Sequence, residues 1–200
     1  MANLPLSVAA DLEPAFIRAL DPQGKVVAAL EALGPVRDRD VLVVDATGGP
    51  FVDGLRSSGA RVSSVALTSP LRLDIADGFA DIVIGLWSAF RGVDPAELAE
   101  VDRVLRPEGR LLVVHDYGRD DVSHLLGERP EYGAWSHRAG PFLTGGFRVR
   151  VVHCFWEFGS LDDATAFLGA AFGTAGSDLA ATLKRPRCSW NVAIYHRTRP

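Results

Sequence analysis

The 200-residue sequence predicts a single α/β domain with a doubly wound, mostly parallel sheet and helices on both faces. Short runs that are apolar throughout suit strands covered on both sides. These runs alternate with longer stretches that carry helix start and stop signals, which is the pattern of α/β folds. With 48% hydrophobic and 23% charged residues, the chain has the composition of a globular domain that can bury a core.

Two helices are expected within residues 1–36, before the sheet begins. Ser7 or Asp11 is placed to cap the first of them. The second is expected to begin at Asp21, because the proline that follows suits a first helical turn, and to end at Gly34. Apolar residues recur on one side of this second helix, so that side is expected to pack near the first strand.

Four strands are expected to be neighbours in the sheet, and three of them, the first, third and fourth, are expected to be buried. They are residues 41–45 (VLVVD), 61–67, 80–87 (ADIVIGLW) and 110–115 (RLLVVH). A helix over residues 51–58 is expected to connect the first strand to the second. Only residues 68–80 separate the second strand from the third, and a helix with its flanking loops needs at least about 10–12 residues between two strands. One strand-helix unit is therefore expected to be missing or reduced.

The helix before the fourth strand has the clearest signals. Asp94, Pro95 and Glu97 suit its N-cap, N1 and N3 positions, where acids favour the positive end of the helix dipole. Pro107 and Gly109 predict its end.

The last quarter of the chain predicts an antiparallel pair of strands at one edge of the sheet. The two β-rich segments are residues 148–158 and 189–196. Between them, Ser160 and Asp163 predict the start of a helix that runs to about Phe172.

Composition and charge exclude several classes of partner. The formal net charge of −4 gives no overall attraction to nucleic acid or to anionic membranes. No apolar run approaches the length that spans a bilayer, and the N-terminus lacks the basic start of a secretory signal. Cys154 and Cys188 form no CxxC pair, which favours a reduced, cytoplasmic setting and gives no support to a metal site. We expect a small-molecule substrate, and the sequence leaves the oligomeric state open.

Residues 101–114 read VDRVLRPEGRLLVV. Together with the preceding strand ADIVIGLW, this stretch resembles the class I S-adenosylmethionine-dependent methyltransferases. The resemblance extends, in the order of elements, over residues 21–196. It implies a Rossmann-like domain, S-adenosylmethionine as the cofactor and methyl transfer to a small molecule. In open α/β sheets ligands bind outside the carboxyl ends of the strands, so the site is expected there.

The resemblance assigns the cofactor to the ends of three strands. The cofactor-binding candidates, in chain order, are Asp45, Thr47, Gly48, Gly49, Thr68 and Trp87. The glycine turn would let backbone amides approach the methionine carboxylate. Thr68 would face the ribose, and Trp87 would form an aromatic wall. The alternative is that Asp45 only caps its turn and that Trp87 belongs to the core.

In this family the turn after the first strand reads acid-x-Gly-x-Gly-x-Gly. When this pattern is aligned on Asp45, its three glycine positions hold Thr47, Gly49 and Phe51, so only the middle glycine is present. Phe51 brings bulk to the methionine end of the pocket. The second strand ends in Thr68, where the family has an acid, and a neutral hydroxyl lacks the stronger charge-assisted pairing of a carboxylate. These departures favour the alternative hypothesis, a non-catalytic methyltransferase-like module that acts in partner binding or regulation.

His115, Asp116 and Tyr117 follow a buried strand and are the candidate catalytic residues. Histidine acts as a general base near neutral pH, and Asp116 and Tyr117 are expected to orient it or the substrate. The alternative is a plain strand end, with Asp116 or Asp120 capping the next helix.

Residues 128–146 are rich in glycine, proline and aromatic residues and predict a long loop that serves as a lid or a substrate-recognition element. Two other enzyme classes lack their motifs. A nucleotide-dependent oxidoreductase would need GxGxxG, and a hydrolase on this type of sheet would need GxSxG.

Overall fold

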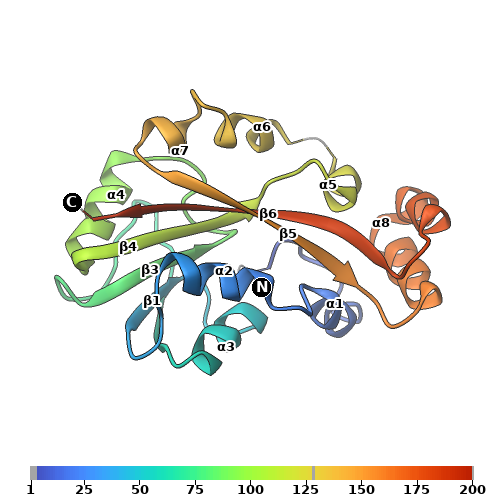
Figure 1. Cartoon of the computed structure of the whole chain (residues 1–200), viewed down its shortest axis with the longest axis horizontal. Coiled ribbons are helices and arrows are strands. Elements are labelled where there is room, and N and C mark those ends of the chain that lie inside the picture. Colours follow the sequence, from blue (N-terminus) through green and yellow to red (C-terminus); the bar gives the residue numbers. More distant parts are fainter. Residues whose placement is uncertain (1–3, 128, 200) are drawn as a thin grey trace.

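The computed structural model describes residues 4–127 and 129–199. Its centre is one six-stranded sheet with the order β2-β1-β3-β4-β6-β5 (Figure 1). The strands are β1 (Asp40–Val44), β2 (Arg61–Val65), β3 (Ala80–Leu86), β4 (Leu105–Asp116), β5 (Arg148–Glu157) and β6 (Arg187–Thr198). The first four are parallel, and β6 runs antiparallel between β4 and β5. The predicted fold is therefore confirmed, including the antiparallel pair at one edge.

Helices cover both faces of this sheet (Figure 1). They are α1 (Glu13–Ala19), α2 (Lys25–Leu33), α3 (Pro50–Ser57), α4 (Pro95–Val104), α5 (Asp121–Leu126), α6 (Pro130–Ser136), α7 (Pro141–Thr144) and α8 (Leu161–Thr182). One apolar core holds buried residues of α1, α2, α3 and α8, and a second core holds those of α4 and α7. Both faces of β1, of β3 and of the second half of β4 are thus buried, which explains why these segments are apolar, whereas the edge strand β2 is only partly buried. Among the described helices, none combines the length and apolar character needed to cross a membrane.

The N-terminal helices differ in their starts from the prediction. Neither Ser7 nor Asp11 caps α1, which follows Leu12 and has no side-chain cap. The start predicted at Asp21 is wrong by several residues, because α2 begins after Gly24, whose φ is 64°. Asp21 instead accepts a hydrogen bond from the amide of Val26 at 2.8 Å, which satisfies a donor of the first turn of α2. The predicted end at Gly34 is confirmed.

Helix α8 consists of two helical segments, and the predicted helix is the first of them. Ser160 caps it by accepting from the amide of Asp163, as expected. This first segment runs to about Phe172, as predicted, and the non-helical backbone of Gly173, with a φ of 60° and a ψ of −135°, separates it from a second segment that ends at Thr182. Glycine tolerates this positive φ, so the chain can end one helix here and begin the next.

The segment between β2 and β3, residues 66–79, contains neither a helix nor a strand. Two residues of α4 hold it in place. Glu100 accepts from the amide of Leu73 at 2.8 Å, and Arg103 donates to the carbonyls of Leu73 and Ile75, each at 2.8 Å. Hydrogen bonds from Arg103 and Leu73 lower the pKa of Glu100 to about 2. The expected loss of a strand-helix unit is confirmed, and β2 becomes an edge of the sheet.

Candidate functional site

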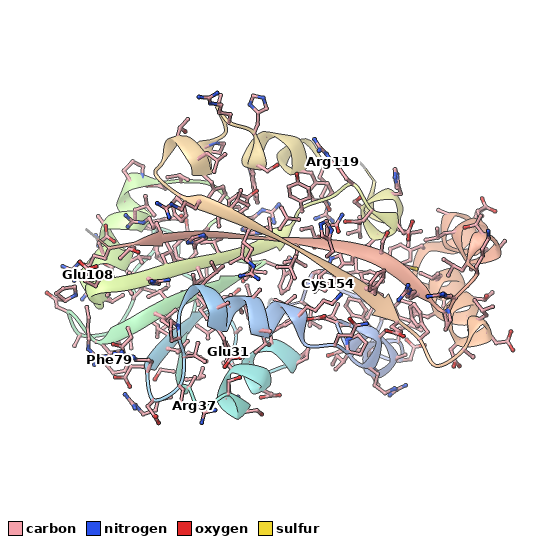
Figure 2. All side chains as sticks on the ribbon, viewed as in Figure 1. Glu31, Arg37, Phe79, Glu108, Arg119 and Cys154 are labelled. Atoms are coloured by element: carbon pink, nitrogen blue, oxygen red, sulfur yellow. The ribbon has the colours of Figure 1, made fainter. Side chains whose placement is uncertain are left out.

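The candidate site lies where β3 and β4 end. Glu108 and Arg119, labelled in Figure 2, mark the amino and carboxyl ends of β4. At the carboxyl end, a cavity of about 190 Å³ opens between the sheet, the N-terminal segment and α6. Its lining comprises Leu4, Pro5, Leu6, Ser7, Trp87, Arg91, His115, Asp116, Arg129, Tyr132 and Trp135. Two of the three predicted catalytic residues and one predicted cofactor residue therefore share one cavity.

Asp116 is the buried charge of this cavity. The indole nitrogens of Trp87 and Trp190 donate to its Oδ1 at 3.1 Å and 3.0 Å. Burial outweighs these two hydrogen bonds and raises the pKa of Asp116 to about 6. Within the described part of the chain, no hydrogen bond to Oδ2 is found, so this second oxygen is the atom that Asp116 can offer to a ligand.

His115 lies beside Asp116 and is almost fully buried. Its Nε2 is 3.1 Å from the carbonyl oxygen of Phe90. Because a carbonyl only accepts, Nε2 carries a proton in this contact. The rings of His115 and Trp135 pack in a T-shaped arrangement, with centroids 4.7 Å apart. The α6 segment thereby packs directly on the predicted base.

Aromatic side chains fill the switch point of the sheet, between the carboxyl ends of β1 and β3. The ring of Phe51 lies 5.0 Å from that of Trp87, and Trp87 lies 5.8 Å from Trp190. Phe51 and Trp87 are buried in the core that α3 shares with α8. In an open α/β sheet this crevice is where a nucleotide ligand binds. The residues present here do not fit the methionine end of S-adenosylmethionine without displacing the Phe51–Trp87 contact.

The predicted cofactor turn after β1 is more exposed to solvent than the buried rings of Phe51 and Trp87. Asp45 is half-buried with a φ of 61°, and Thr47 is exposed. Gly49 precedes α3 with a φ of 102°, a conformation that favours glycine. A side chain added at Gly48 would meet no atom within 4 Å, so this side of the turn faces open space.

The end of β2 offers little to a nucleoside. Thr68 is exposed, and its hydroxyl closes a local turn by accepting from the amide of Arg72 at 2.8 Å and donating to the carbonyl of Pro70 at 2.9 Å. The predicted ribose contact would have to compete with these local bonds. No strand follows on the outer side of β2 within the described residues, so the side of the pocket that a further strand would build is missing.

Tyr117, the third predicted catalytic residue, is not part of the cavity lining. Its amide donates to the carbonyl of Asn191, and its ring lies under the guanidinium of Arg119 at 5.9 Å. Asp120, rather than Asp116, caps the next helix, because it accepts from the amide of Ser123 at 2.7 Å in a capping box.

The segment predicted as a long loop, residues 128–146, instead contains α6 and α7. Residue 128 lies outside the described residues. Pro130 and Pro141, which suggested a loop, each stand at the first position of a helix. The segment does cover the carboxyl edge of the sheet, because Tyr132 and Trp135 line the cavity.

Sequence reasoning missed three parts of this site. Arg129 lies in the segment predicted as a lid, so its position was a usable signal. The N-terminal segment Leu4 to Ser7 carries no motif that marks it as part of a site. Trp190 lies 74 residues from Asp116 in the chain, and only the pairing of β4 with β6 brings the two together. In the described residues, no cluster of three potential metal ligands occurs.

Comparison with solved structures agrees with this architecture. A candidate type II methyltransferase from Anaeromyxobacter dehalogenans is 16% identical, with a TM-score of 0.56, over 87% of this chain and 95% of that one. The MccD protein is 13% identical, with a TM-score of 0.53, over 89% and 99% of the two chains. The chain has the fold of the class I S-adenosylmethionine-dependent methyltransferases.

Likeness at this level of identity shows the methyltransferase fold alone. An S-adenosylmethionine-dependent methyltransferase from Aquifex aeolicus is 17% identical, with a TM-score of 0.49, over 90% and 93% of the two chains. No family model and no curated protein matches the sequence. Since one fold hosts many functions, the function has to be argued from the site.

Proposed function

We propose that this methyltransferase-like protein binds a small polar molecule in the cavity at the ends of β3 and β4 and no longer uses S-adenosylmethionine. The contact between Phe51 and Trp87 carries this proposal, because it occupies the crevice at the switch point. The cavity itself is smaller than the roughly 300–1,000 Å³ of typical ligand pockets, which suits a compact ligand rather than a whole nucleoside.

The second candidate function is methyl transfer from S-adenosylmethionine to a small molecule held in the same cavity. The conformation of Gly49 at the start of α3 favours it, because the N-terminus of a helix attracts an anionic group. In that case Asp45 and the turn would hold the methionine end of the cofactor, which supplies the methyl group. His115, which lines the cavity, would be the general base that takes a proton from the methyl acceptor.

Calorimetric titration with S-adenosylhomocysteine separates the two candidates. The first predicts no measurable binding to the wild type, because two buried rings occupy the site. Phe51→Gly removes one of these rings and is the variant in which binding can appear. The second predicts wild-type binding that Gly49→Val weakens by about tenfold to a hundredfold, the equivalent of roughly 1–3 kcal/mol for one lost hydrogen bond.

Ligand binding in the cavity has its own readout. The indole N–H signals of Trp87 and Trp190 report on the cavity in nuclear magnetic resonance, because both groups are bonded to Asp116. Trp87→Phe and Trp190→Phe assign them among the four tryptophans of the chain. A panel of small polar molecules that leaves both signals unmoved would contradict the proposed function.

We also propose a cytoplasmic location. Both cysteines are free and buried, and burial raises the pKa of each thiol to about 12, which keeps them unreactive. Such cysteines need no oxidising compartment.

A further inference from the structure

The cavity at the ends of β3 and β4 contains opposite charges. Asp116 and Arg129 both line it, and the two charges attract each other. Asp116 comes from the end of β4, and Arg129 immediately precedes α6, so two separate elements supply them. A ligand between them therefore meets an anionic end and a cationic end.

The anionic end has unused bonding capacity. Both indole donors bond to Oδ1 of Asp116, and the neighbouring Oδ2 retains its lone pairs for a ligand donor. With a pKa of about 6, the carboxyl group is mainly ionised at neutral pH although it is buried. A buried charge is costly unless it is paired, so a cationic ligand group is the most favourable partner.

The walls of the cavity also suit a cation. Trp87 and Trp135 both line the cavity, and aromatic rings attract ammonium groups. The guanidinium of Arg91 already makes a cation–π contact of this kind, 5.5 Å from the centre of the Trp135 ring. Leu4 and Leu6 of the N-terminal segment also line the cavity.

From these observations, and resting on the proposed function, we infer that the ligand is a small zwitterion. Its ammonium group binds Oδ2 of Asp116, and its anionic group binds the guanidinium of Arg129. The cavity volume of about 190 Å³ limits the ligand to the size of a short amino acid.

Three probes of similar size test this inference. β-Alanine carries both charges, ethylamine carries only the ammonium group, and propionate carries only the carboxylate. Each is titrated against the full chain while the indole signals of Trp87 and Trp190 are followed. Asp116→Asn keeps an oxygen that accepts from both indoles, and Arg129→Gln removes the guanidinium. Asp74→Asn and Arg119→Gln are matched controls, since both residues are exposed and outside the cavity.

We expect β-alanine to bind most tightly to the wild type. Asp116→Asn should weaken β-alanine and ethylamine at least about tenfold and leave propionate unchanged, whereas Arg129→Gln should weaken β-alanine and propionate and leave ethylamine unchanged. Ethylamine should also lose affinity as the pH falls below about 6, because Asp116 takes up a proton. The controls should behave as the wild type.

Two outcomes would overturn the inference. If propionate binds as tightly as β-alanine, and Asp116→Asn does not change its affinity, the cavity is a simple anion site. That result would leave the proposed function intact. The absence of any response to the three probes would also reject a zwitterion. Binding of S-adenosylhomocysteine to the wild type would instead overturn the proposed function, and the pattern of the three probes would then describe the methyl acceptor.

Discussion

The indole nitrogen of Trp190 donates a hydrogen bond to the buried carboxylate of Asp116 across 3.0 Å. This bond joins the carboxyl end of β4 to the antiparallel strand β6, which brings Trp190 to the cavity. The final strand of the chain therefore helps to build the site, and the acidity of Asp116 depends on contacts that form only in the complete sheet.

Asp116→Asn should change how stability depends on pH. Because burial raises the pKa of Asp116 from 3.8 to about 6, the folded state holds its proton more tightly than the unfolded state. The contribution of Asp116 to the free energy of unfolding therefore falls as the pH rises from about 4 to about 6, by up to about 3 kcal/mol. Relative to the wild type, the variant should gain stability between pH 4 and pH 7.

Urea unfolding of both proteins at the two pH values measures this difference. Asp74→Asn is the control, because it removes an exposed carboxylate. An equal effect of Asp116→Asn at pH 4 and pH 7 would show that burial does not perturb this group.

Glu100→Gln should destabilise the protein by about 1–3 kcal/mol at pH 7, because it weakens charge-assisted bonds to Arg103. The pKa of Glu100 is lowered to about 2, so its stabilising effect is complete above about pH 4.5 and is lost as the pH falls toward 2. Chemical unfolding at pH 7 gives the magnitude. Glu108→Gln, at an exposed position of the same strand-helix unit, should cost little. Similar losses in both variants would refute the anchoring role of Glu100.

Amide hydrogens of residues 129–146 should exchange faster than those at the centre of β4. Helices α6 and α7 have seven and four residues, and isolated helices this short are marginal in water. Their protection therefore depends on packing through Trp135 and Phe142. Hydrogen exchange with mass spectrometry tests this, and β-alanine should slow exchange in this segment. Protection equal to that of β4 in the free protein would contradict the prediction.

Much of the fold could be predicted because its signals are local. Asp94 caps α4, with its carboxylate 2.7 Å from the amide of Ala96, and the residue pattern alone indicated this. The apolar run that became β4 likewise predicts a buried strand without knowledge of its neighbours. Positions at strand ends follow from the same reasoning, which is how His115 and Asp116 were identified.

The remaining features depend on contacts between distant residues. Nothing near Phe51 in the chain indicates that its ring packs on Trp87 rather than facing a ligand. The two hydroxyl bonds of Thr68 depend on a turn whose geometry the sequence does not specify. Prolines misled the prediction for residues 128–146, because Pro130 and Pro141 begin helices there instead of interrupting them. Sequence pattern thus placed the candidate residues at the strand ends but did not predict the space that the side chains leave between them.

The reduced connection between β2 and β3 also changes what the protein presents to other chains. Without that strand the sheet ends about 4.8 Å further in, and β2 is its edge strand. The backbone of β2 must therefore be kept from pairing with a strand of another molecule. β2 is only five residues long and begins with Arg61, whose guanidinium is tied to Asp40 at 2.7 Å. A short strand with a charged start is a poor template for pairing with a second molecule, so the shortened sheet still ends in a form that resists edge-to-edge aggregation.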